Sequence, residues 1–139
     1  MFRASAFCLL PSIACLPARD LPPVCFAQAE ITFRSEQAEQ CPDPGEIDTA
    51  LTLVISTADT PISTLNGWTA VYEDEAQWSD ERGPFAGLTD VENRLVWVAF
   101  RNVYGPIPVT RHEFFHACLF ELTGDPDTDH SDSRWNLVN

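Results

Sequence analysis

The chain has 139 residues, of which 21 are aspartate or glutamate and eight are arginine, and it contains no lysine. The formal net charge of −13 argues against nucleic acids and anionic membrane surfaces as partners, because both require a basic surface. The absence of lysine excludes Schiff-base catalysis and the lysine of phosphate-binding loops. An apolar fraction of 45 % suffices for the core of one folded domain, and the length indicates no more than one.

The amino end has the features of an export signal. A single arginine precedes a short apolar stretch, and residues 27–29 (Ala-Gln-Ala) match a signal-peptidase cleavage pattern. We therefore predict a signal peptide over 1–29, a single domain over 30–139, and a secreted or periplasmic protein. The stretch 12–15 resembles a lipoprotein box, which leaves anchoring through Cys15 as an alternative. No run of 18 apolar residues occurs, so the sequence predicts no transmembrane helix.

Of the five cysteines, the predicted domain keeps Cys41 and Cys118. Two cysteines in an exported chain can form one disulfide. The alternative is that Cys118 is a small buried apolar residue on a helix. The sequence leaves both open.

Weak alternation predicts a short strand over 30–34, and clearer alternation predicts a strand over 67–73. Between them the apolar spacing predicts a helix over 46–58, with Asp43 as a candidate cap and Pro44 in its first turn. The acidic, turn-rich segment 73–84 is typical of a surface loop.

The second half of the chain contains the strongest elements. Residues 94–101 are apolar on both faces and predict a buried strand. A helix is predicted over 109–123, ending at Gly124, and a polar, acidic tail follows. We expect these strands and helices to form a small α+β domain.

The predicted second helix contains His112, Glu113 and His116 in the pattern H-E-x-x-H. Two histidines four residues apart lie on one helical face, so both can bind one metal ion, and Glu113 is placed to act as a general base. Zinc is the ion that this donor set favours. Two structural alternatives remain: histidines that hydrogen-bond to carbonyl groups in the core, and Glu113 as the partner of Thr110 in a capping box.

A catalytic zinc site needs a third protein ligand and one open position. His130 follows His116 by 14 residues, across the predicted helix end, and is our candidate for the third ligand. The alternatives are three aspartates of the tail: Asp127, Asp129 and Asp132. Alternatively, Asp129 or Asp132 could accept a hydrogen bond from the ring nitrogen of a ligand histidine that does not bind the metal.

The tail also resembles the start of a calcium-binding loop, with Asp125, Asp127 and Asp129 in alternate positions. His130 stands where such a loop needs glycine, and Asn136 where it needs glutamate. The calcium interpretation is therefore the weaker one.

The H-E-x-x-H helix resembles the active-site helix of the zincin superfamily of metallopeptidases. The resemblance covers about 94–135 and implies a zincin-like fold, in which a short mixed sheet packs on a buried active-site helix. It implies His112 and His116 as zinc ligands and Glu113 as the base that activates water. It also implies that strand 94–101 is the sheet edge that holds an extended peptide substrate.

The sequence lacks the motifs that define two zincin subfamilies, the metzincins and the gluzincins. Leu119 and Leu122 stand where metzincins have glycine and histidine, and no glutamate follows Glu121 to act as a gluzincin ligand. The stretch 116–135 is similar to small exported bacterial proteins that have H-E-x-x-H and a later histidine.

Together these observations predict an exported zinc metallopeptidase that hydrolyses peptide bonds, with His112, His116 and His130 as ligands and Glu113 as the base. Tyr104 and Arg134 are candidates for stabilising the oxyanion. The alternative function is a non-catalytic extracellular module in which zinc or calcium stabilises the fold.

Overall fold

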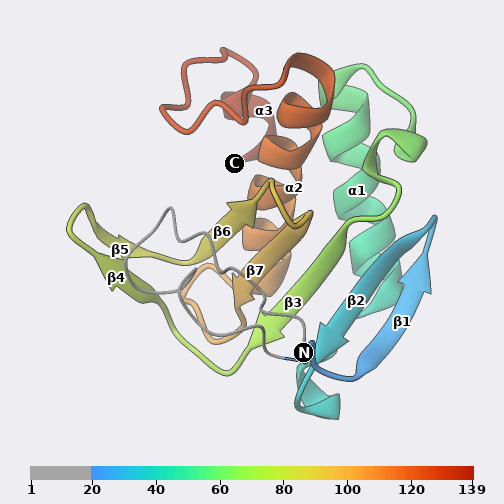
Figure 1. Cartoon of the computed structure of the whole chain (residues 1–139), viewed down its shortest axis with the longest axis vertical. Helices are drawn as coiled ribbons and strands as arrows, with labels where there is room; N and C mark the ends of the chain where they lie inside the picture. The colour runs from blue at the N-terminus through green and yellow to red at the C-terminus, as the bar shows by residue number, and fades with distance from the viewer. Residues whose placement is uncertain (1–19) are drawn as a thin grey trace, which may run out of the picture.

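The computed structural model describes residues 20–139 and shows one mixed sheet with two long helices packed on one of its faces (Figure 1). The predicted lipoprotein box at 12–15 lies outside the described residues. The α+β class predicted from the sequence is confirmed. The elements are β1 Val24–Gln28, β2 Ile31–Ser35, α1 Pro44–Ala58, β3 Thr69–Glu73, β4 Trp78–Asp80, β5 Gly83–Phe85, β6 Gly87–Asp90, β7 Leu95–Ala99, α2 Pro106–Thr123 and α3 Trp135–Val138, with short 3-10 helices at Ala38–Gln40 and Ile62–Leu65.

The strand order in the sheet is β1-β2-β3-β7-β6. Strands β2, β3 and β7 are parallel, while β1 and β6 run antiparallel to their neighbours at the two edges. Strand β7 therefore lies inside the sheet, and the expectation that 94–101 forms the substrate-binding edge is wrong. Its apolar residues on both faces are those of an interior strand. The edge near α2 is β6, a four-residue strand (Gly-Leu-Thr-Asp) whose pattern is too short to predict.

Helix α1 forms where the sequence predicts it, beginning two residues earlier. The Asp43 carboxylate accepts a hydrogen bond from the Glu46 N–H at 3.0 Å, and Pro44 occupies the first turn, where no N–H is needed. Leu51 and Val54 are buried against the sheet and α2. The helix ends at Asp59 in the left-handed conformation.

Helix α2 begins at Pro106, earlier than the predicted start, and ends at Gly124, whose φ of 79° is the left-handed cap that glycine favours. The early start places Glu113 in the third turn, so its predicted alternative as a capping-box residue is wrong. The Thr110 hydroxyl instead donates to the Pro106 carbonyl at 2.7 Å and hydrogen-bonds to the Tyr72 hydroxyl at 2.9 Å.

Cys41 forms a disulfide with Cys25, and Cys118 is a buried free thiol on α2. The suggested Cys41–Cys118 pairing is therefore wrong, and the alternative, a buried Cys118 on a helix, is confirmed. The partner of Cys41 is Cys25, which lies within 1–29, the predicted signal peptide. The disulfide and strand β1 both involve residues that precede the predicted cleavage site after Ala29. A chain that started at Glu30 would lack both β1 and its disulfide to the segment before α1.

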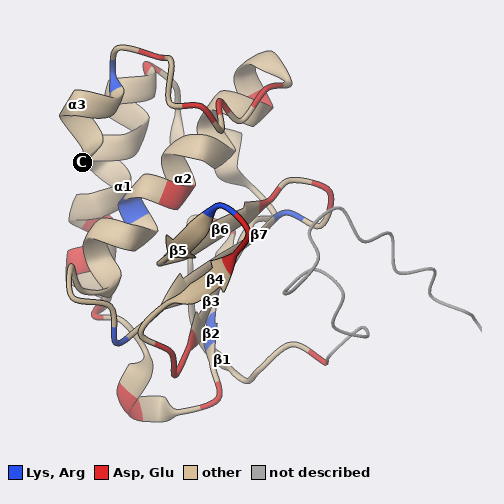
Figure 2. Ribbon diagram, turned by 90° about the vertical axis from the view of Figure 1, so that its left-hand side faces the viewer, with Lys and Arg blue, Asp and Glu red and all other residues tan. Residues whose placement is uncertain are grey.

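The acidic segment 73–84 is only partly a loop. Strands β4 and β5 pair in it as a short hairpin, with the Trp78 and Phe85 rings 6.0 Å apart and an Arg82–Asp80 ion pair at 2.5 Å. Acidic residues are spread over the loops and helices (Figure 2). Among residues 20–139, no helix combines the length and apolar character needed to cross a membrane.

Candidate metal centre

The three histidines converge on one point. His112 and His116 lie one turn apart on α2, with their Nε2 atoms 3.2 Å from each other. His130 lies in the loop after α2, and its Nε2 is 3.0 Å from that of His112 and 3.2 Å from that of His116. Within the described part of the chain, this trio is the one group of histidine, cysteine or acidic side chains with the proximity that a metal ion requires.

The outer nitrogens of the two helical histidines are held by acceptors. His116 Nδ1 donates to the Pro126 carbonyl at 2.6 Å, and His112 Nδ1 donates to Asn139 Oδ1 at 2.7 Å. A neutral imidazole has one proton, so both Nε2 atoms present lone pairs to the centre. Burial lowers the pKa of His116 to about 4 and lowers that of His112, which keeps both rings neutral.

A cation between the three nitrogens would satisfy the lone pairs that face one another. The one Nε2 proton that neutral His130 could carry satisfies one neighbour and leaves other lone pairs facing each other. A tetrahedral zinc ion with bonds of about 2.0–2.1 Å separates its nitrogen ligands by about 3.3–3.4 Å. The observed separations of 3.0–3.2 Å are close to this, and imidazole is a preferred zinc ligand. The residues present therefore fit a zinc ion.

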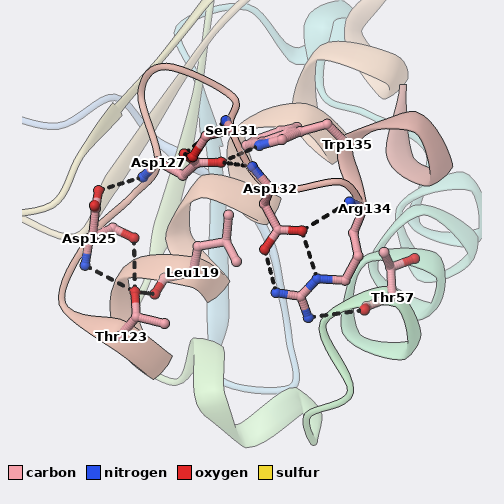
Figure 3. A network of polar contacts seen from close by, with 9 residues as sticks. All are labelled: Thr57, Leu119, Thr123, Asp125, Asp127, Ser131, Asp132, Arg134 and Trp135. Atoms are coloured by element: carbon pink, nitrogen blue, oxygen red, sulfur yellow. Dashed lines mark hydrogen bonds and ion pairs between the residues drawn. The ribbon is translucent and has the colours of Figure 1, made fainter.

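The carboxylate of Asp127 is engaged in hydrogen bonds with its own loop and with Trp135 (Figure 3). Its Oδ1 accepts from the N–H and hydroxyl of Ser131, and its Oδ2 accepts from the Asp132 N–H and the Trp135 indole. These hydrogen bonds lower the pKa of Asp127 well below its usual value. Asp132 pairs with Arg134 at 2.7 Å. Neither carboxylate belongs to the convergent group, in which His130 occupies the third position.

The calcium alternative gains no support from the loop. The Asp125 carboxylate accepts the Asp127 N–H at 2.8 Å, and Asp127 is engaged as described. Two of the three alternate aspartates, Asp125 and Asp127, thus accept hydrogen bonds from the loop itself.

Trp135, the first residue of α3, packs against all three imidazoles. Its ring lies 4.8 Å from that of His112, 4.4 Å from that of His116 and 4.5 Å from that of His130, measured between centroids. The Trp135 ring also contacts the Phe115 ring of α2 edge-on, with 4.6 Å between the ring centroids. The indole is therefore an apolar wall that covers one side of the site.

Glu113 follows His112 on α2 and is buried, with 6 % of its surface exposed. The Thr89 hydroxyl of β6 donates to its Oε2 at 2.7 Å. Gly87, also on β6, lies so close that a Cβ there would be 2.5 Å from Glu113 Oε1. Burial raises the pKa of Glu113 to about 7, and the Thr89 hydrogen bond opposes this rise.

The histidines and Glu113 share a cleft of about 660 Å³. Its walls are the β4–β5 hairpin, strand β6, the first turns of α2 and the loop that carries His130. Tyr104 lines this cleft. Arg134 is not among its lining residues: it pairs with Asp132 and lies over the Phe115 ring, so its predicted role at the oxyanion is not supported.

Four residues that complete the site were not predicted from the sequence: Gly87, Thr89, Trp135 and Asn139. The first two stand on an edge strand that gave no periodic signal, and the last two lie in a tail that was read only as polar. No local pattern could have identified them, because each acts through a tertiary contact.

Comparison with protein-family models, with curated proteins and with solved structures finds no match for this chain. The geometry of the site is therefore the basis for any functional assignment.

Proposed function

We propose that this protein is an exported zinc-dependent metallopeptidase. The observation that carries the proposal is the convergence of three Nε2 atoms within 3.0–3.2 Å at a cleft that also contains the buried carboxyl group of Glu113. A metal site that only stabilised a fold would have no need of such a carboxyl group or of an open cleft.

His112, His116 and His130 would hold the ion, with Asn139 and the Pro126 carbonyl orienting the two helical rings. A zinc ion bound there would supply a Lewis acid for the scissile carbonyl and for a water molecule. Glu113 would accept the proton of the attacking water and pass it to the leaving amine. A pKa near neutrality suits a group that must both take and release a proton.

The cleft suits an extended peptide. Strand β6 is the last strand of the sheet order and lines the cleft, so its outer edge offers backbone groups to a further strand. A peptide bound along β6 would pass the carboxyl group of Glu113, since Gly87 and Thr89 both contact that residue. Tyr104, which also lines the cleft, would be available to contact the same peptide.

The alternative, a non-catalytic structural zinc site, requires a fourth protein ligand. Asp127, in the loop that carries His130, would be a candidate fourth ligand, but its carboxylate is engaged by hydrogen bonds within the loop. We therefore place the catalytic proposal first.

The test compares the full chain with Glu113→Gln and with Glu121→Gln, an acid-to-amide change on the same helix outside the cleft. We expect about one zinc per chain in all three. We expect peptidase activity on casein or a peptide library to fall about 10²–10⁴-fold in Glu113→Gln and to persist in Glu121→Gln.

His130→Ala, measured alongside, should lose zinc. Absence of zinc from the parent after refolding with the metal would refute the proposal. So would equal activity of Glu113→Gln and the parent.

A further inference from the structure

The third ligand is held differently from the other two. Helix α2 fixes the spacing of His112 and His116, whereas His130 comes from the segment between α2 and α3 and is exposed. Asp127 and His130 have φ values of 57° and 54°, in the left-handed region that residues with a Cβ disfavour. The loop therefore needs specific contacts to keep this conformation.

Asp127 supplies these contacts at His130 and at the two residues that follow it. Its own carbonyl accepts the His130 N–H at 2.9 Å. Its carboxylate accepts the Ser131 N–H at 3.0 Å, the Ser131 hydroxyl at 2.6 Å and the Asp132 N–H at 2.9 Å. Figure 3 shows these bonds converging on one side chain. An ionised carboxylate only accepts hydrogen bonds, and all of the groups that contact this carboxylate are N–H or O–H donors.

The same carboxylate also connects the loop to the wall of the site. The Trp135 indole donates to Asp127 Oδ2 at 2.7 Å, and that indole packs against all three imidazoles. Asp127 thus ties the segment that presents His130 to the ring that covers the histidines, although its own carboxylate is not part of the histidine group.

We infer that Asp127 is the positioning residue of the candidate metal site: through the loop backbone and Trp135, its carboxylate holds His130 where the third imidazole completes the site. The inference rests on the metal-binding part of the proposed function and is independent of peptidase activity. Loss of a group that orients a metal ligand typically lowers metal affinity about 10–100-fold.

The test compares zinc affinity of the full chain, Asp127→Asn and Asp125→Asn, by competition with a chromophoric chelator. An amide at 127 keeps the size of the side chain but presents an NH₂ group to some of the four donors. An amide at 125 makes the same charge change in the same loop, and its oxygen can still accept the Asp127 N–H. We expect affinity to fall about 10–100-fold for Asp127→Asn and to stay within about threefold for Asp125→Asn.

The visible spectrum of the Co²⁺-loaded proteins is the second readout, because it reports the number and geometry of the ligands. We expect Asp127→Asn to differ from the parent and Asp125→Asn to match it. A general loss of stability would not change the spectrum of the folded fraction.

If Asp127→Asn does not fold, Trp135→Phe replaces it, because phenylalanine keeps a ring in the wall and removes the N–H that reaches Asp127. Its affinity should fall about tenfold or more. A folded Asp127→Asn, or in its place Trp135→Phe, that binds zinc as the parent does would overturn the inference and leave the proposed function standing. A parent that binds no zinc would overturn both.

Discussion

Gly87 provides a sharp test of the position of Glu113. An ideal Cβ at residue 87 would lie 2.5 Å from Glu113 Oε1 and 2.6 Å from its Cγ, closer than real Cβ contacts. Gly87 does not have a positive φ, so its backbone accepts alanine. Glu113 cannot turn away freely, because it is buried and hydrogen-bonded to Thr89. Alanine at residue 87 therefore forces a shift of this side chain.

We expect Gly87→Ala to lower the free energy of unfolding, because overpacking a filled site costs about 1–3 kcal/mol. The loss of chain entropy in the unfolded state offsets about 0.4–1 kcal/mol of this. In a Glu113→Ala background the clash is absent, so Gly87→Ala should be neutral or slightly stabilising. The double-mutant cycle should therefore give a coupling of about 1–3 kcal/mol between the two sites.

Urea denaturation of the four metal-free proteins, followed by circular dichroism, measures this cycle. Metal-free protein is used so that changes in zinc affinity do not enter the result. An equal cost of Gly87→Ala in both backgrounds would show that residue 87 does not press on Glu113, and it would refute the placement of the carboxyl group against β6.

Three further predictions follow from the contacts of the domain. Asn139→Ala should lower zinc affinity about 10–100-fold in chelator competition, because it removes the acceptor of His112 Nδ1. Cys25→Ala combined with Cys41→Ala should lower the free energy of unfolding by about 3 kcal/mol, since the disulfide closes a loop of 16 residues. This difference from the parent should vanish when both are unfolded with reductant present. Cys118 should resist iodoacetamide at pH 8 in the folded protein and react in urea, as judged by peptide mass spectrometry. The reason is that burial raises the pKa of its thiol to about 12. Alkylation at equal rates in both conditions would contradict its position in the core.

Local sequence patterns predicted the elements that have a strong period or a clear boundary. Helix α1 follows from its cap and apolar face, and α2 ends at the glycine that the sequence indicated. Strand β7 was predicted from its apolar run. The short elements were not predicted: β6 and α3 have four residues each, and the β4–β5 hairpin lies in an acidic segment. Such elements are stabilised by their neighbours, so their own residues contain little signal.

The sequence by itself determined the part of the site that depends on helix geometry. Once α2 is a helix, His112 and His116 must share a face, and Glu113 must project beside them, because the period of the helix sets these directions. The third histidine, by contrast, comes from a loop whose path is held by tertiary hydrogen bonds, among them those of Asp127 with Asp132 and Trp135. Glu113 meets β6 because the sheet order places that strand, and not β7, at the edge. The contacts of His130 with His116 and of Thr89 with Glu113 join residues 14 and 24 positions apart, where chain connectivity sets no direction and only the packed tertiary structure decides which groups meet.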